Sequence, residues 1–191
     1  MMTKFEDFSV GDTISFKRKF EIKDYNKFAD LSGDFNPLHH DTNYSITSGH
    51  NFNIVPLHLI VSPLSRIAGM NFPGTPSLYL SHKIRAINQL QYNETITYSA
   101  KVISLNISKR IMTVRVIGAV ESKIIFDSEL STHATHSVWK QEKDCQIIRG
   151  SKKKRVLITG ASGQIASALA KKFYDNGWSL LLQTRSKNSS I

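Results

Sequence analysis

The sequence contains a single cysteine, Cys145, among its 191 residues. A lone cysteine cannot form a disulfide within the chain. Long apolar runs are also missing, since none approaches the roughly 18 residues that a membrane-spanning helix needs. The first residues lack the basic-then-apolar pattern of a signal peptide. We therefore expect a cytoplasmic protein that has no membrane partner.

Acidic residues are scarce relative to basic ones, and the formal net charge is +10. The excess is uneven: residues 1–139 are almost neutral, and most of the surplus Lys and Arg lies in residues 140–191. No nucleic-acid-binding motif accompanies the charge, so we expect no nucleic-acid partner. The change in composition instead indicates two units of different origin.

Hydrophobic periodicity predicts an α+β domain in the first part of the chain. Alternating apolar residues predict a strand over 13–22, and helical spacing predicts a helix over 24–31 that Gly33 ends. Residues 54–70 predict a buried helix that Pro63 interrupts, because proline has no N–H for the helical hydrogen bond. Four more strands are predicted, over 77–87, 94–105, 109–120 and 123–138. This order suggests a sheet packed on a central helix.

The segment SGDFNPLHHD, residues 32–41, places an acid, Asp34, shortly before a histidine, His39. An Asp and a His within reach of one water can activate that water or return a proton. Pro37 stiffens the loop between them. From these residues alone, three interpretations stay open: an acid/base pair, an ordinary polar turn, or part of a metal site. Residues 41–53 are polar and rich in turn-forming residues.

The metal interpretation has candidate ligands but no suitable frame. Adjacent histidine side chains point apart, and the spacings that are typical of common metal sites are absent. We therefore expect no metal site, and we expect His40 to take no part in the chemistry. The candidates considered are His39, His40, Asp41, His50 and His58.

Residues 28–41, FADLSGDFNPLHHD, closely resemble the signature of the MaoC-like R-specific enoyl-CoA hydratases and 3-hydroxyacyl thioester dehydratases. The resemblance extends from about residue 5 to about residue 138 and includes VGD at 10–12, the PG turn at 73–74 and SLYL at 77–80. It implies a hot-dog fold, in which an antiparallel sheet wraps a long helix, and a homodimer. The implied reaction is the reversible hydration of trans-2-enoyl thioesters of CoA or of an acyl carrier protein, without a cofactor.

The resemblance also implies roles for single residues. Asp34 and His39 match the family's catalytic pair, which would hold the water that adds to C3 of the substrate. Ser65 matches a serine that supports the aspartate. Asn36 belongs to the motif, and we expect it to shape the loop beside the substrate.

The chain departs from the family at residues 56–58, where Pro-Leu-His replaces His-Gly-Met. In the family, the glycine N–H polarises the thioester carbonyl, as an oxyanion hole does. Leu57 still supplies an N–H, but we expect its side chain to crowd that carbonyl. A non-catalytic hot-dog domain that binds acyl thioesters or mediates dimerisation is therefore the alternative.

Residues 158–166, ITGASGQIA, follow a strand-like run and open a helix-like one. They fit the pattern T-G-x-x-G-x-x-G, with Ala166 in the last place, and resemble the start of a short-chain dehydrogenase/reductase. Glycines in this context let a pyrophosphate approach a helix N-terminus closely. The resemblance implies NADP as cofactor, held by Gly160, Ser162, Gly163, Ile165 and Arg185.

This C-terminal part is interpreted as an incomplete Rossmann βαβ unit. The rest of the sheet and the Tyr-x-x-x-Lys pair of such reductases do not follow it, so we expect weak or no dinucleotide binding. The predicted organisation is a hot-dog hydratase domain over 1–139, a basic linker over 140–154 and a truncated dinucleotide-binding fragment over 155–191.

Overall fold

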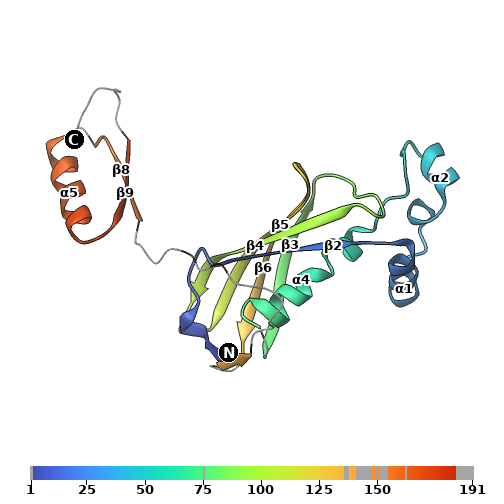
Figure 1. Cartoon of the computed structure of the whole chain (residues 1–191), viewed down its shortest axis with the longest axis horizontal. Coiled ribbons are helices and arrows are strands. Elements are labelled where there is room, and N and C mark those ends of the chain that lie inside the picture. Colours follow the sequence, from blue (N-terminus) through green and yellow to red (C-terminus); the bar gives the residue numbers. More distant parts are fainter. Residues whose placement is uncertain are drawn as a thin grey trace. The chain divides into compact units, whose positions relative to one another are not determined.

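The computed structural model describes residues 2–74, 76–135, 138–140, 148, 150, 155–161 and 163–183. The chain forms two compact units, Met1–Gly150 and Ser151–Ile191, each with its own hydrophobic cluster. Figure 1 shows the elements of both. Most of the predicted linker, residues 141–147, 149 and 151–154, lies outside the described residues.

The first unit is built on a five-stranded antiparallel sheet in the order β2-β4-β5-β6-β3, so that β2 and β3 are its edges. The strands are β2 Thr13–Lys19, β3 Ser77–Ala86, β4 Thr95–Asn106, β5 Ile111–Val120 and β6 Lys123–Ala134. The five predicted strands are thereby confirmed, although the last one ends earlier than expected. A separate short strand, β7 Val138–Lys140, pairs instead with β1, Met2–Lys4.

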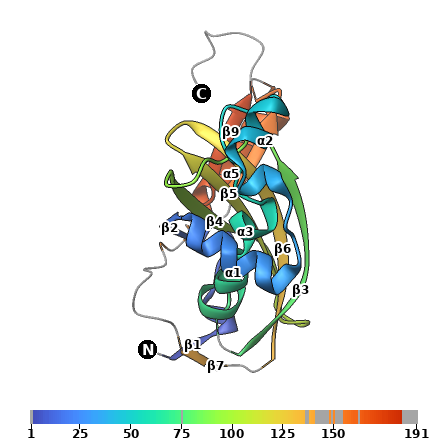
Figure 2. The ribbon, with the colours of Figure 1, turned by 90° about the vertical axis from the view of Figure 1, so that its right-hand side faces the viewer.

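A helical segment lies along one face of this sheet (Figures 1 and 2). It consists of α3 Leu57–Val61, α4 Pro63–Arg66 and a π-helical turn, η3, Ile67–Asn71. The predicted interruption at Pro63 is confirmed, because α3 and α4 are separate elements on either side of Ser62. Together, sheet and helix confirm the α+β class.

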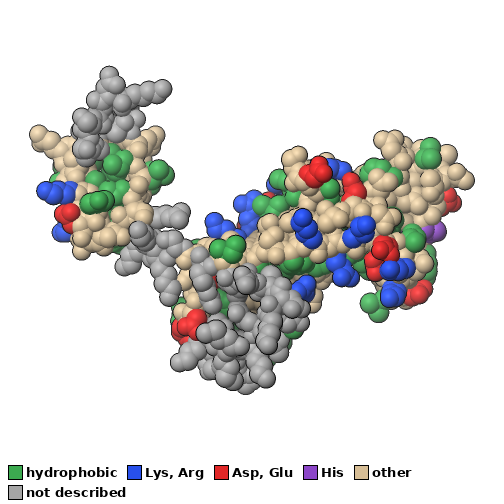
Figure 3. Space-filling view, viewed as in Figure 1, with side chains coloured by type: hydrophobic (Ala, Val, Ile, Leu, Met, Phe, Trp, Pro, Cys, Tyr) green, Lys and Arg blue, Asp and Glu red, His purple; other side chains and the backbone are tan. Residues whose placement is uncertain are grey.

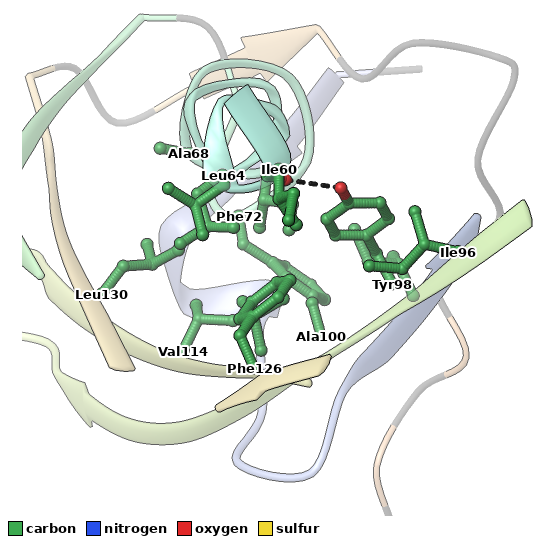
Figure 4. Packing of buried hydrophobic residues seen from close by; sticks show 14 of the residues in the cluster. Ile60, Leu64, Ala68, Phe72, Ile96, Tyr98, Ala100, Val114, Phe126 and Leu130 are labelled. Carbon is green, nitrogen blue, oxygen red and sulfur yellow. Dashed lines mark hydrogen bonds between the residues drawn. The ribbon is translucent and has the colours of Figure 1, made fainter. Parts of the chain in front are cut away.

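Side chains of the helical segment and of the inner sheet face fill the core between them (Figure 4). Alternate residues of a strand point to the same face, so every second residue is buried from Ile96 to Val102 in β4 and from Met112 to Gly118 in β5. The hydroxyl of buried Tyr98 donates a hydrogen bond to the carbonyl of Ile60 and joins strand to helix. The labelled core residues are Ile60, Leu64, Ala68, Phe72, Ile96, Tyr98, Ala100, Val114, Phe126 and Leu130, and all are buried.

Buried Asp12 ties a late segment of the chain to the first unit. Its Oδ1 accepts a hydrogen bond from the Gly150 N–H at 2.6 Å. Beside it, the backbones of Thr13 and Ile148 exchange two hydrogen bonds of 2.7 Å. Ile148 and Gly150 therefore belong to the first compact unit.

Helix α1, Ile22–Ser32, leaves the end of β2 and carries the chain to the SGDFNPLHHD loop. Gly33 ends it with φ 76°, a left-handed conformation that favours glycine. The predicted helix and its stop signal are confirmed. Short 3-10 turns follow at η2, Pro37–His39, and occur near the N-terminus at η1, Phe5–Asp7.

The polar, turn-rich residues 41–53 contain a helix that the sequence patterns do not predict. Helix α2, Thr42–Thr47, begins where the Asp41 carboxylate accepts a hydrogen bond from the Tyr44 N–H at 3.0 Å. Such an N-cap stabilises a helix start independently of apolar periodicity. The segment has no apolar repeat, and hydrophobic pattern alone therefore missed it.

The second unit consists of β8 Arg155–Thr159, α5 Gln164–Asp175 and β9 Ser179–Gln183. The two strands are parallel neighbours, joined through the helix. Ile158, Ala161 and Ala170 form its small buried cluster. In the part of the chain that the structure describes, no helix is both long enough and apolar enough to cross a membrane.

Candidate active site

A chain of local hydrogen bonds shapes the loop that follows α1. The Ser32 hydroxyl donates to the Phe28 carbonyl at 2.6 Å and accepts from the Asp34 N–H at 3.2 Å. Next, Asp34 Oδ1 accepts from the Asn36 N–H at 3.3 Å, and Asn36 Oδ1 accepts from the Leu38 N–H at 3.1 Å. These hydrogen bonds therefore fix the position of the Asp34 carboxylate relative to the first residues of η2.

A longer-range contact orients His39. Its Nδ1 lies 2.6 Å from the carbonyl oxygen of Ile54, which can only accept a hydrogen bond. Nδ1 must therefore carry the proton, and in the neutral ring Nε2 carries a lone pair. That Nε2 lies 3.7 Å from Asp34 Oδ2, and the two side chains are 13 % and 40 % exposed respectively. A carboxylate and a basic nitrogen thus face each other where solvent reaches them.

Tyr25 of α1 holds the loop through contacts of its hydroxyl. Its buried hydroxyl donates to the Asp34 carbonyl at 3.1 Å, and it lies 3.1 Å from Nδ1 of His40. Because the hydroxyl proton is engaged by the carbonyl, His40 Nδ1 is the donor in the second contact. The rings of Tyr25 and His40 stack with centroids 5.6 Å apart. Figure 3 shows histidine beside acidic side chains at this end of the unit.

Sequence reasoning did not predict the contact between His40 and Tyr25, which lies in the helix before the motif. A tyrosine on the face of α1 that carries buried Ala29 was the available signal. Burial, and after it the charge of Asp34, raises the pKa of Tyr25, so its hydroxyl stays protonated as a donor.

The other predicted residues of the first unit lie on the helical segment. Leu57 is the first residue of α3, and its N–H has no hydrogen-bond acceptor among the described residues. Its side chain packs, half-buried, against the core. Ser65 is exposed on α4, and within the described part of the chain its hydroxyl makes no hydrogen bond to Asp34.

The candidate metal ligands do not converge in the described residues. No three His, Cys, Asp or Glu side chains of this part of the chain are placed to share an ion. The histidine and aspartate of the central pair are instead engaged by backbone groups, as described above. The site as described offers acid/base chemistry on a water.

In the second unit, the predicted cofactor residues lie around the start of α5. Gly160 has φ 64°, and Gly163 precedes the first residue of the helix. Together with the strongly exposed Ile165 they line an open hollow of about 690 Å³. Ser162 and Arg185 lie outside the described residues.

Comparison with known proteins relates the chain to a family of hydratases. No family model matches the chain. An (R)-specific enoyl-CoA hydratase from Rhodospirillum rubrum is 26% identical over 125 residues, which are 65% of this chain and 87% of that protein. One from Aeromonas caviae is 30% identical over 108 residues, 56% of this chain and 81% of that protein. The solved (R)-hydratase from A. caviae has a TM-score of 0.64 at 26% identity, covering 67% of this chain and 98% of that structure.

The wrapped helix and antiparallel sheet of the first unit are a hot-dog fold, as predicted. The chain belongs to the (R)-specific enoyl-CoA hydratase family.

Proposed function

We propose that the first unit catalyses the reversible hydration of trans-2-enoyl thioesters, with Asp34 and His39 as its catalytic residues. The observation that carries this proposal is the arrangement of His39. Nδ1 is held by the Ile54 carbonyl, and Nε2 faces Asp34 Oδ2 across 3.7 Å. That separation is too long for a direct hydrogen bond, and a water hydrogen-bonded to both groups fits beside the pair.

In the proposed reaction, Asp34 positions the water and His39 acts first as a base and then as an acid. The Asp34 carboxylate accepts a hydrogen bond from the water and so orients it. His39 Nε2 takes the other proton of the water as the water oxygen bonds to C3. The electron pair of the C2–C3 double bond moves to C2 and the thioester carbonyl. C2 then takes the proton from His39, which restores the neutral ring. Dehydration of a 3-hydroxyacyl thioester runs these steps in reverse.

Negative charge on the thioester oxygen needs a donor in this scheme. We assign that role to the N–H of Leu57, which has no acceptor among the described residues. A donor aimed at developing charge typically contributes a factor of about 10²–10³ in rate. Ser65 and Asn36 complete the proposed substrate site, Asn36 through the loop that it caps. The thioester is carried by CoA or by an acyl carrier protein.

We propose that two copies associate through the free edge of the sheet. β3 is an edge strand of ten residues and carries Leu78 and Leu80, which are 55% and 50% exposed. Long edges with exposed apolar side chains are prone to pair with another chain. Light scattering coupled to gel filtration tests this homodimer, and a monomeric mass at micromolar concentration would contradict it. With its single cysteine, we assign the protein to the cytoplasm.

For the C-terminal part we propose the beginning of a Rossmann dinucleotide-binding unit, selective for NADP through Arg185. The βαβ order, the positive φ of Gly160 and the position of Gly163 before α5 support this proposal. The proposed domains remain 1–139 and 155–191, joined by 140–154. We expect weak or no binding in a calorimetric titration with NADP, because a lone βαβ unit offers little of the usual site. Tight binding would contradict that expectation.

The replacement of His-Gly-Met by Pro-Leu-His at residues 56–58 favours one alternative, a non-catalytic domain that binds acyl thioesters or mediates dimerisation. Hydration of crotonyl-CoA separates the two functions. We expect turnover by the wild-type chain and a loss of about a hundredfold or more in Asp34→Asn and His39→Ala. Asp30→Asn, at an exposed position of α1, is the matched control and should keep wild-type turnover. Binding of crotonyl-CoA without any turnover would favour the alternative.

A further inference from the structure

Tyr92 lies beside the site although it is far from the SGDFNPLHHD motif in sequence. It follows Gln91, which forms an antiparallel bridge with Ile54, and the Val55 N–H donates to the Leu90 carbonyl at 3.0 Å. Ile54 is the residue whose carbonyl holds His39. Tyr92 therefore follows a segment that pairs directly with Ile54, the residue that orients His39.

The hydroxyl of Tyr92 is buried, yet it has no hydrogen-bond partner among the described residues. The ring packs against the core. A buried polar group without a partner destabilises a fold and is uncommon, so it calls for a reason. Tyr98 shows the usual arrangement in this chain, since its buried hydroxyl is bonded to the Ile60 carbonyl.

The charged groups that affect the pKa of Tyr92 are residues of the candidate site. Burial raises its pKa most, and the negative charges of ionised Tyr25 and of the Asp34 carboxylate raise it further. Tyr92 thus stays protonated and keeps a proton to donate. Tyr25 is not an alternative donor to the carboxylate, because its proton is engaged by the Asp34 carbonyl, and its remaining contact is with His40.

The Asp34 carboxylate is loosely held and has room for another donor. Oδ1 accepts from the Asn36 N–H at 3.3 Å, and Oδ2 lies 3.7 Å from His39. Catalytic hydrogen bonds are often long in the free enzyme and tighten when substrate binds.

We propose that Tyr92 is a positioning residue of the hydration site, and that its hydroxyl donates a hydrogen bond to the Asp34 carboxylate when the thioester is bound. The proposal rests on the hydratase function proposed above. Donation to the ionised carboxylate stabilises that form and fixes the oxygen that receives the water. The Tyr92 hydroxyl, which is unpaired in the free enzyme, then donates to Asp34 in the substrate complex.

Tyr92→Phe tests this in the full-length chain, because it removes only the hydroxyl. We expect kcat for crotonyl-CoA to fall about tenfold or more, with KM little changed. The acid limb of the kcat profile should move to higher pH by roughly one unit. The free protein should melt at a higher temperature, since an unpaired buried group is gone. Unchanged kcat and an unchanged acid limb would overturn the proposal.

Tyr98→Phe is the matched control, because there the same change breaks an existing hydrogen bond. It should melt at a lower temperature without moving the acid limb. If the wild-type chain does not hydrate crotonyl-CoA, the proposed function fails, and a second measurement judges Tyr92 separately. That measurement is the carbon-13 resonance of the Asp34 carboxyl at neutral pH with crotonyl-CoA bound. A difference between wild type and Tyr92→Phe supports the hydrogen bond, and identical resonances overturn it.

Discussion

The Nδ1 atom of His39 and the carbonyl oxygen of Ile54 are 2.6 Å apart. This contact joins the loop after α1 to the segment that precedes α3. It selects the ring nitrogen that carries the proton and leaves the other nitrogen facing Asp34. The tautomer of His39 on which the proposed chemistry depends is therefore selected by a backbone group.

Tyr25→Phe should weaken both the loop and the activity. The variant keeps the ring that stacks on His40 but loses the hydroxyl that contacts the Asp34 carbonyl and His40 Nδ1. We expect a loss of about 1–2 kcal/mol in the free energy of unfolding and a several-fold lower kcat. Urea denaturation and crotonyl-CoA turnover measure the two effects. A double-mutant cycle with His40→Ala should show coupling between the two side chains, and strict additivity would argue against the contact.

Leu57→Gly should raise the rate of hydration at the expense of stability. The N–H at position 57 is kept, while the side chain that we expect to crowd the thioester carbonyl is removed. The loss of a half-buried leucine and the flexibility of glycine at a helix start should together destabilise the fold by about 1–3 kcal/mol. Steady-state kinetics and thermal melting give the two readouts. Leu57→Ala should lie between wild type and glycine in rate, and a slower Leu57→Gly would contradict the crowding.

Gly118→Ala should be strongly destabilising because no space exists for a methyl group at that position. A Cβ there would lie 2.1 Å from Cε1 of Phe126 and 2.9 Å from Cδ1 of Ile96. Overpacking of a core typically costs about 1–3 kcal/mol. Gly69→Ala is the matched control, because a Cβ at Gly69 meets nothing within 4 Å. Equal melting temperatures of the two variants would refute the close packing of β5 on β6.

The ion pair between Arg115 and Asp127 should make stability depend on pH in the acid range. Arg115 donates to both carboxylate oxygens of Asp127, at 3.0 and 2.7 Å. The hydrogen bond from Arg115, more than its charge, lowers the pKa of Asp127 in the folded chain. A lowered folded-state pKa means that the stabilisation is present above the unfolded value, near about 4. It is lost as the pH falls through the folded value.

Asp127→Asn measures that contribution. The variant should be slightly less stable than wild type at neutral pH, because both partners are partly in water and the pair is screened. The difference should shrink as the pH falls below about 4. Chemical denaturation at a series of pH values provides the test, and a difference that grows on acidification would contradict the assigned sign.

Sequence patterns predicted the parts of the fold that depend on local chemistry. The stop of α1 at Gly33 and the break at Pro63 follow from the backbone properties of single residues. The strands were predicted from the alternation of apolar and polar residues, which matches the sheet because only one of its faces is buried. Helix α2 was missed because its stability comes from the Asp41 cap, and a polar segment has no periodicity to detect.

The candidate site was predictable only as far as the motif extends. Asp34 and His39 are close in sequence, and a motif can identify them together. The Ile54 carbonyl cannot be found in this way, since every residue has a carbonyl and only the fold brings this one to His39. Tyr92 follows residues 90 and 91, which pair with residues 55 and 54, a long-range relation that no local pattern contains.

The Ile54 acceptor also determines which mutations can damage the enzyme. A backbone oxygen survives every substitution of its own residue, so no change at position 54 simply deletes it. It can be lost only by displacing the chain, for example by disturbing the contact between Val55 and fully buried Leu90. Inactivating substitutions should therefore include apolar residues that never meet the substrate, and a survey restricted to polar side chains would overlook them.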